Sequence, residues 1–402
     1  MKEDGTMRQQ LGNDIVIELM QMAEEDAELK HLMELAAGQA GRTVPDRSVE
    51  PVYDLASWYA FLDRAYRALP WAIYPGTDHT RLYDQIDQSM GCLYFVCEQH
   101  LKELEGRGYL YPCLSHHEPF RSWFARYLKG YGSFLDTEES WREEFYQRAL
   151  GNPDFQLDGG LYEDPANWKT FNQFFARKLS DPSKRAPEAP DDERVIVSPA
   201  DAVPQPVREI DENGRIGMPD ELREAGLVIK TAAFRDVSRL LAGSRYADSF
   251  AGGRLTHTLL DIYDYHRYHF PVSGTVKEVL HVPAADAPGG VITWNAETGR
   301  YQEYFSDSAA WQCTETRGIV IVETEGGTLA AVIPVGMCQV SSVNFEDTVV
   351  PGAKVKKGDP LGYFLFGGSD IVMLFSKGAD FVMTAQPSEH LDAGREYGRI
   401  AR

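Results

Sequence analysis

The sequence predicts an α+β protein in which a helical N-terminal domain, residues 1–165, precedes a β-rich domain, residues 166–402. The first observation is the length, because 402 residues exceed the usual size of one hydrophobic core and favour two domains. The second is a change near residue 165, where apolar residues spaced three and four apart give way to short β-branched and aromatic runs. A helical half followed by a β-rich half is an α+β arrangement.

Four stretches of the first half have the apolar spacing of helices. The first, DIVIELMQMAEEDAELKHLMELAAG, ends at Gly38, which we expect to be its C-cap. The others are ASWYAFLDRAYRAL, TRLYDQIDQSMGCLYFVCEQHLKELEG and PFRSWFARYLKGYGSFL. Their aromatic stripes are typical of helix packing, so no catalytic constellation is predicted in this half. The adjacent His116 and His117 have no partner at metal-ligand spacing, and no metal site is predicted.

The second half has the texture of strands separated by turns. It follows PEAPDDE, residues 187–193, which predicts a polar linker or loop. Short apolar runs such as RVIVSPADAV, GVITW, RGIVIVE and LGYFLF are divided by turn signals, among them Glu325-Gly326-Gly327. One helical piece, AAFRDVSRLLAG, interrupts them.

Charge and composition exclude several classes of protein. The net charge of −21 argues against nucleic-acid binding and opposes an anionic membrane surface. No apolar run approaches the roughly 20 residues of a membrane-spanning helix, and the first residues lack the apolar core of a signal peptide, so we expect a cytoplasmic protein. The five cysteines include no repeated CxxC pair, which predicts neither a disulfide framework nor a zinc site: Cys92, Cys97, Cys113, Cys313 and Cys338.

Three short islands in the second half carry residue types that catalyse reactions. They are SPADA at 198–202, YHRYH at 265–269 and GGS at 367–369, and no nucleotide loop, HExxH or GxSxG motif accompanies them. Taken singly, each island has an ordinary explanation as a turn, a structural histidine or a strand bulge. Together they offer the groups of an oriented base acting on a hydroxyl: Asp201, His266, His269 and Ser369.

The islands resemble those of the phosphatidylserine decarboxylase family. SPADA resembles its SPADG, YHRYHFPVSGTV its YHR-x-H-x-P-x-x-G segment, and VKKGDPLGYFLFGGSDIVMLF the region that ends in LGST or GGST. FNQFFARKLSDPSKRAP resembles its FF-x-R-x-L segment, and the helical half resembles that of fungal L-tryptophan decarboxylase-like members. Two residues depart from the pattern, since Asp370 stands where the common motif has Thr and Ala202 where it has Gly.

The resemblance implies that the chain cuts itself between Gly368 and Ser369. Glycines before the serine leave its hydroxyl free to fold back onto the Gly368 carbonyl carbon in a strained turn. His269 would take the hydroxyl proton while Asp201 fixes the tautomer of that histidine. The products would be associated chains of residues 1–368 and 369–402, and the cofactor would be a pyruvoyl group derived from Ser369.

The pyruvoyl group would form a Schiff base with a substrate α-amine and accept the electrons released as CO2 departs. We expect His266 to protonate the α-carbon afterwards or, alternatively, to orient the substrate carboxylate. Tyr265 and Tyr268 are expected to bind the substrate, and either is a second candidate for the acid.

Three functions stay open at this point. The favoured substrate is an aromatic L-amino acid, tryptophan first, which needs only a closed pocket. The alternative is phosphatidylserine, decarboxylated to phosphatidylethanolamine, which requires docking at a membrane. The third is an unprocessed, non-catalytic binding protein, if Asp370 disables cleavage. Oligomeric state and metal dependence are not predicted.

Overall fold

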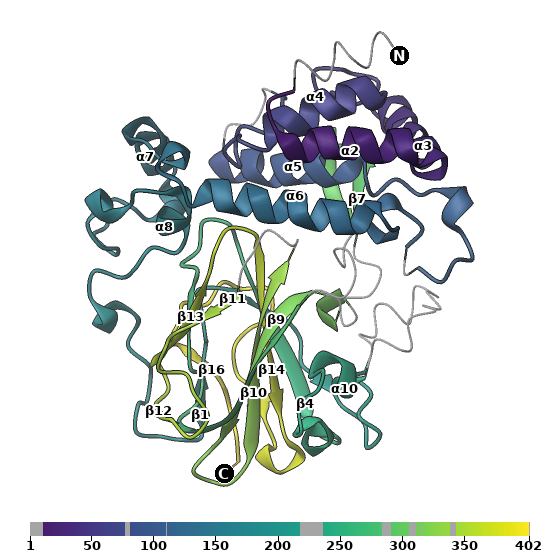
Figure 1. Ribbon diagram of the computed structural model, residues 1–402. Coiled ribbons are helices and arrows are strands. Elements are labelled where there is room, and N and C mark those ends of the chain that lie inside the picture. Colours follow the sequence, from purple (N-terminus) through teal and green to yellow (C-terminus); the bar gives the residue numbers. More distant parts are fainter. Residues whose placement is uncertain are drawn as a thin grey trace. The chain divides into compact units, whose positions relative to one another are not determined.

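A computed structural model of the chain describes residues 11–76, 81–109, 111–217, 236–283, 291–304, 311–313, 315–337 and 343–401. The chain divides into two compact units (Figure 1), Met1–Asn152 with Asp286–Phe305 and Pro153–Ala285 with Ser306–Arg402. The first unit thus takes one segment from the β-rich half of the sequence. The domain limits expected from the sequence, 1–165 and 166–402, stay a prediction.

The first unit contains six α-helices among the described residues, together with one β-hairpin. The helices are α2 (Asp14–Glu25), α3 (Ala27–Thr43), α4 (Leu55–Ala65), α5 (Leu82–Phe95), α6 (Phe120–Leu135) and α7 (Glu143–Leu150). Aromatic side chains fill the interior, as the stripes in the sequence predict. Trp123 and Tyr127 of α6 are fully buried, and their ring centroids lie 5.3 Å apart.

The first predicted helix is divided in two at Asp26. The Asp26 carboxylate accepts hydrogen bonds from the backbone N–H groups of Glu28, at 2.9 Å, and Leu29, at 3.0 Å, and thereby caps α3. Helix α3 continues to Thr43, so the expectation that Gly38 ends the helix is wrong. A glycine inside a helix costs about 1 kcal/mol, which burial of the apolar face of α3 outweighs.

The hairpin of the first unit is formed by β7 (Val291–Asn295) and β8 (Arg300–Tyr304). The Gln88 side chain of α5 pairs with the backbone of Tyr301, accepting from its N–H at 2.8 Å and donating to its carbonyl at 2.9 Å. The Tyr301 hydroxyl donates to the buried Glu50 carboxyl at 3.0 Å, and burial raises the pKa of Glu50 to about 7. These contacts bind a segment distant in sequence to the helices.

The second unit is built on an eight-stranded antiparallel sheet. Seven strands follow the order β12 (Lys354–Val355), β6 (Gly274–Val282), β9 (Thr316–Glu323), β10 (Leu329–Met337), β14 (Gly368–Phe375), β4 (Arg254–Leu260) and β2 (Val203–Pro204), and β3 (Arg208–Glu209) also pairs with β4. Two three-stranded sheets accompany it: β11 (Val343–Phe345), β13 (Pro360–Phe364) and β5 (Arg267–His269); and β1 (Val195–Val197), β16 (Glu396–Arg399) and β15 (Val382–Met383). Together with the helices of the first unit, these sheets confirm the α+β class.

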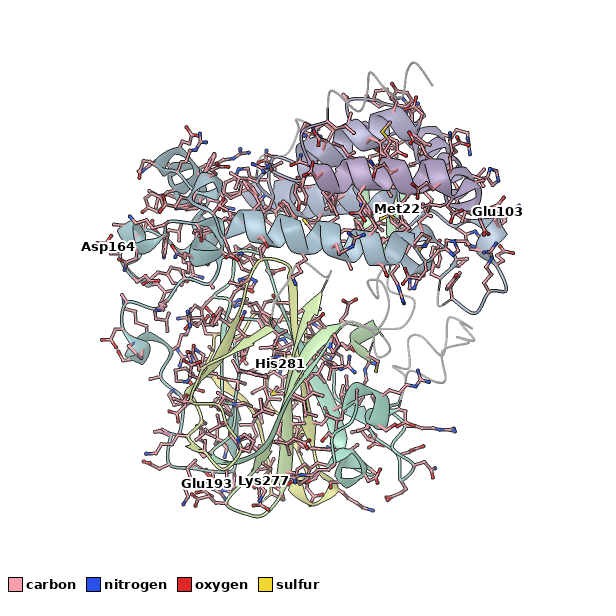
Figure 2. The ribbon with its side chains drawn as sticks, in the orientation of Figure 1. Met22, Glu103, Asp164, Glu193, Lys277 and His281 are labelled. Carbon is pink, nitrogen blue, oxygen red and sulfur yellow. The ribbon has the colours of Figure 1, made fainter. Side chains whose placement is uncertain are left out.

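The large sheet buries both of its faces. Apolar side chains on one face pack with α10 (Val237–Leu240) into the core of the unit: Leu255, Ile319, Ile321, Ile333, Val335, Val372 and Leu374. On the other face, the Thr256 hydroxyl lies 2.7 Å from the hydroxyl of Tyr397 in β16. Figure 2 draws the side chains on the ribbon, with His281 of β6 labelled. Because alternate residues of β14 point to opposite faces, Ser369 and Asp370 enter different environments.

Two further expectations concern cysteines and membrane spans. Four cysteines are buried with free thiols, namely Cys92, Cys97, Cys113 and Cys313, whereas Cys338 lies outside the described residues. Of the predicted helical piece AAFRDVSRLLAG, its first four residues also lie outside them. In the part of the chain that the structure describes, no helix is both long enough and apolar enough to cross a membrane.

Candidate active site

Ser369 is the second residue of β14, and its hydroxyl is buried without a hydrogen-bond partner among the described residues. The residue pairs with Leu260 of β4 on one side and Gly336 of β10 on the other. No turn is present at Gly368-Ser369 in this structure, because both residues belong to β14: Gly368 pairs with β10 alone, whereas Ser369 pairs with strands on both sides. The unusual backbone angle lies one residue earlier, at Gly367, whose φ of 152° favours glycine.

His269, the predicted base, ends strand β5 with both ring nitrogens engaged. Its Nδ1 lies 3.0 Å from the Gly358 carbonyl, which can only accept, so Nδ1 carries the hydrogen. Its Nε2 lies 3.2 Å from the Tyr265 hydroxyl. Burial lowers the pKa of His269, so the ring is neutral and Nε2 accepts a hydrogen bond from the Tyr265 hydroxyl. Nε2 thus has the lone pair that a general base needs, and the Tyr265 hydroxyl donates a hydrogen bond to it.

Asp201 is held by Arg185 instead of contacting the ring of His269. Arg185 donates from Nε at 2.8 Å and from Nη2 at 2.7 Å to the two carboxylate oxygens, and the Ala393 N–H adds a third bond at 2.8 Å. The expectation that Asp201 fixes the tautomer of His269 by direct contact is therefore not met in this state. The Gly358 carbonyl fixes the tautomer instead. The negative charge of Asp201 favours the protonated form of His269, against the larger effect of burial.

His266 is fully buried and neutral in the uncut chain. Its Nδ1 donates to the Asp264 carbonyl at 2.9 Å, and its ring lies 3.8 Å from the ring of Phe175 in α8 (Phe171–Phe175). Burial and the nearby Arg177 charge lower the pKa of His266 to about 3. The Phe175 ring in turn meets the Phe366 ring edge-on, so ring contacts link His266 to the segment that precedes the predicted cleavage site.

The neutral His266 is expected to make the protein less stable in acid. Because its folded pKa of about 3 lies below the unfolded value near 6.5, the unfolded chain binds more protons between these values. Stability is therefore lost as the pH falls through this window, by about 2 kcal/mol at about pH 5 from this group alone. We expect urea unfolding of Ser369→Ala protein to show this loss between about pH 7 and pH 5.

The matched variant is His266→Asn in the same Ser369→Ala chain, because asparagine keeps a donor for the Asp264 carbonyl and does not titrate. Its loss of stability over the same pH interval should be smaller by about 2 kcal/mol. Equal losses in the two proteins would contradict the neutral state of His266.

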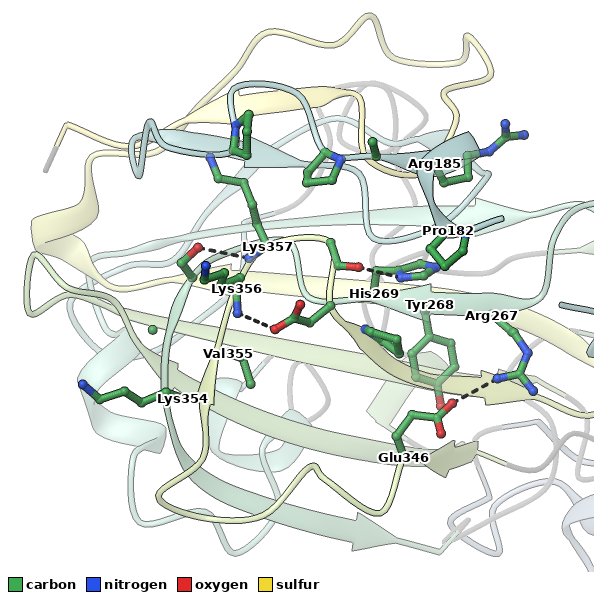
Figure 3. Close-up of a pocket in the computed structure, with 18 of the residues that line it drawn as sticks. Pro182, Arg185, Arg267, Tyr268, His269, Glu346, Lys354, Val355, Lys356 and Lys357 are labelled. Atoms are coloured by element: carbon green, nitrogen blue, oxygen red, sulfur yellow. Dashed lines mark hydrogen bonds and ion pairs between the residues drawn. The ribbon is translucent and has the colours of Figure 1, made fainter. Parts of the chain in front are cut away.

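A cavity of about 1320 Å³ borders His269 (Figure 3). Tyr265 and Tyr268, the predicted substrate-binding residues, both line it, although their hydroxyls have protein partners. The Tyr268 hydroxyl donates to the Asn344 carbonyl at 2.6 Å. Ser369 is not part of the described lining, so the structure brings His269 and the tyrosines to this cavity but not the predicted nucleophile.

Several residues of the site could not be singled out from the sequence. Arg185 lies inside the FNQFFARKLSDPSKRAP segment, but nothing in that segment indicates Asp201 as its partner. His257 and Gln312, which contact the Asp370 carboxylate, are likewise distant from it in sequence. Among the described residues, no group of three or more His, Cys, Asp or Glu side chains is arranged to hold a metal ion.

The family model and the relatives that match this chain all describe decarboxylases. The phosphatidylserine decarboxylase family matches residues 171–399. A phosphatidylserine decarboxylase proenzyme of Azotobacter vinelandii is 30% identical over 250 residues, covering 57% of this chain and 77% of the relative. Decarboxylase iboD of the fungus Amanita muscaria is 30% identical over 262 residues, covering 60% and 69%.

Coverage is smaller for other relatives. Phosphatidylserine decarboxylase proenzyme 2 of Oryza sativa is 30% identical over 227 residues, and the match covers 56% of this chain but 32% of the relative. The family match begins at Phe171, the first residue of α8, so it excludes Met1–Asn152 of the first unit but includes the segment Asp286–Phe305. The chain belongs to the phosphatidylserine decarboxylase family, whose members are pyruvoyl-dependent carboxy-lyases made as self-cleaving proenzymes.

Proposed function

We propose that this chain cuts itself between Gly368 and Ser369 and then decarboxylates an aromatic L-amino acid, with tryptophan the first candidate. The observation that carries the proposal is the buried Ser369 hydroxyl, which has no partner among the described residues. Leaving such a group unsatisfied costs about 1–3 kcal/mol, and unsatisfied groups of this kind occur at catalytic sites. The residues present therefore fit a pyruvoyl group made from this serine.

The cleavage is an internal acyl shift followed by elimination. The Ser369 Oγ attacks the carbonyl carbon of Gly368, the amide C–N bond breaks, and the hydroxyl proton passes by way of the base to the freed nitrogen of Ser369. Loss of the Ser369 Cα proton then expels the Gly368 carboxylate and leaves a dehydroalanine. Tautomerisation and addition of water release ammonia and leave a ketone at the new end of residues 369–402.

His269 is the base that this scheme needs. Among the described residues, the Tyr265 hydroxyl, at 3.2 Å, is the one group that contacts its Nε2, and rotation of that hydroxyl releases the contact. Catalytic contacts are often long or unformed before the reacting geometry is reached, so the absence of a Ser369 contact fits a resting proenzyme. The charge of Asp201 favours the imidazolium that forms when His269 takes the proton.

The pyruvoyl group supplies an electron sink for loss of CO2 from an α-amino acid. We assign His266 to hold the proton that the substrate α-carbon takes up after CO2 leaves. In the uncut chain its low pKa keeps the ring neutral. A substrate carboxylate bound nearby would raise that pKa, because an opposite charge favours the protonated ring. Binding of the substrate thus prepares the acid.

Two observations support a free amino acid as the substrate. The cavity beside His269 is lined mainly by charged and polar side chains, with prolines and the two tyrosines among them. The amino and carboxylate groups of a free amino acid find charged partners there. The charge of −21 also opposes an anionic lipid surface. Relatives named phosphatidylserine decarboxylase proenzymes make that phospholipid the alternative substrate.

The substrate test is denatured intact mass after incubation with L-tryptophan, or separately with phosphatidylserine vesicles, in the presence of a reductant that makes the amine link permanent. We expect residues 369–402 to carry the mass of one tryptophan-derived amine. The Ser369→Ala chain, treated in the same way, is the control and should carry none. Labelling by the vesicle lipid at the higher rate would reverse the choice of substrate, and a single uncut mass would favour the unprocessed binding protein.

A further inference from the structure

The carboxylate next to the predicted cleavage site is held by two side chains. Both oxygens of Asp370 lie 3.1 Å from Nδ1 of His257 in β4, and Gln312 donates from Nε2 to one of them at 2.8 Å. Because a carboxylate only accepts, Nδ1 of His257 carries the hydrogen. All three side chains are buried, and Asp370 is fully so. We call this arrangement the Asp370 clamp.

The clamp lies on the face of the sheet opposite to the Ser369 hydroxyl. Alternation along β14 places Asp370 with Val372 and Leu374, in the apolar core beneath α10. A buried carboxylate that loses its hydrogen-bond donors is strongly destabilising, because nothing then replaces the water it gave up. At this position the common family motif has threonine, which needs no such partners. An aspartate here is therefore tolerated because His257 and Gln312 are present.

We propose that His257 and Gln312 are positioning residues for self-cleavage, acting through Asp370; this inference rests on the proposed function. The acyl shift requires the Gly368-Ser369 peptide to leave its extended geometry while the residue after the serine stays in place. The clamp holds Asp370 from one face of the sheet, and the Ser369 hydroxyl lies on the opposite face, where the clamp does not obstruct it. Movement is thereby confined to the Gly367-Gly368 side, where the backbone is permissive.

The clamp also acts after the cut. Asp370 then becomes the first unmodified residue of the short chain, and chain ends fray unless side chains or ladders hold them. His257 belongs to β4, in the long chain, so its bond to Asp370 joins the two products directly at the new terminus. The reactive end of residues 369–402 stays in the sheet during turnover.

The test follows the rate of cleavage of the full chain by intact mass during timed cell-free synthesis. We expect His257→Ala to slow cleavage at least tenfold, because among the described residues the buried Asp370 carboxylate then keeps Gln312 as its one side-chain partner. His257→Asn, which retains a donor close to the Nδ1 position, should recover part of the rate. His281→Ala is the matched control: this exposed histidine of β6 (Figure 2) lies outside the clamp and should leave the rate unchanged.

The decisive comparison is made in the Asp370→Thr background. A residue that acts only through the carboxylate has nothing to hold there, so adding His257→Ala should not slow cleavage further. A tenfold loss in both backgrounds, or cleavage of His257→Ala at the wild-type rate, overturns the clamp. If His257→Ala gives no soluble protein, Gln312→Met carries the same comparison, with about a threefold loss expected only when Asp370 is present.

Failure of the clamp and failure of the proposed function give different results. Wild-type chain that is cut before Ser369, together with variants that are cut equally fast, overturns the clamp alone. Wild-type chain that stays uncut overturns both.

Discussion

A chain in which Ser369 is replaced by alanine is expected to stay a single polypeptide of 45.2 kDa and to release no CO2 from any substrate. Alanine has no nucleophile to attack the Gly368 carbonyl, so neither the cut nor the ketone can form. Removal of a nucleophile of this kind costs several orders of magnitude in rate. The measurement is denatured intact mass of purified protein, with CO2 release recorded on the same sample.

The controls separate self-cleavage from proteolysis. Ser369→Thr retains a hydroxyl and should still be cut, but more slowly, because a branched side chain has fewer rotamers in a strand. Ser133→Ala, at an exposed serine of α6, should be cut as fast as the wild type. A Ser369→Ala chain that is cut at the same position would show that another protease acts there and that Ser369 is not the nucleophile.

The elements that sequence patterns predicted well are those whose side chains face one environment along their length. Helix α6 begins and ends within one residue of PFRSWFARYLKGYGSFL, because its aromatic residues recur at helical spacing and face one core. Strand β13 begins one residue before LGYFLF and ends two residues before its last residue. The division at Asp26 was missed because an internal N-cap outcompetes an apolar pattern that runs on without a break. The placement of β7 and β8 depends on Gln88, more than 200 residues away.

The candidate site shows the same limit at the scale of single bonds. Motifs placed Asp201, His269 and Ser369 in one unit, yet the bonds that fix them come from elsewhere. Arg185 pairs with Asp201, 16 residues away in sequence. The carbonyl that fixes His269 belongs to the backbone of Gly358, and because every residue has such a carbonyl, the sequence does not indicate which one is used. Side-chain identity predicts which groups are available, whereas their pairing follows from the register of distant segments.

Loss of Arg185 is expected to be the second largest effect. Its guanidinium forms a bidentate pair with Asp201, at 2.8 and 2.7 Å, and the exposed fractions of the two side chains are 9% and 3%. Arg185→Ala leaves a buried carboxylate with the Ala393 N–H alone, which should cost about 3–5 kcal/mol of unfolding free energy. We would measure this by urea unfolding of Ser369→Ala protein at neutral pH, followed by circular dichroism.

Two further variants decide whether the cost comes from the unpaired charge. Adding Asp201→Asn to Arg185→Ala removes the charge and keeps a polar group, so the double variant should be more stable than Arg185→Ala alone. Arg395→Ala is the matched control: its pair with Glu188 is 59% and 42% exposed, and its loss should cost less than about 1 kcal/mol. Equal losses for the two arginines would show that Asp201 is accessible to water. In that case the charge of Asp201 would stabilise the protonated form of His269 less than a buried carboxylate does. Another group of the long chain would then have to stabilise the imidazolium.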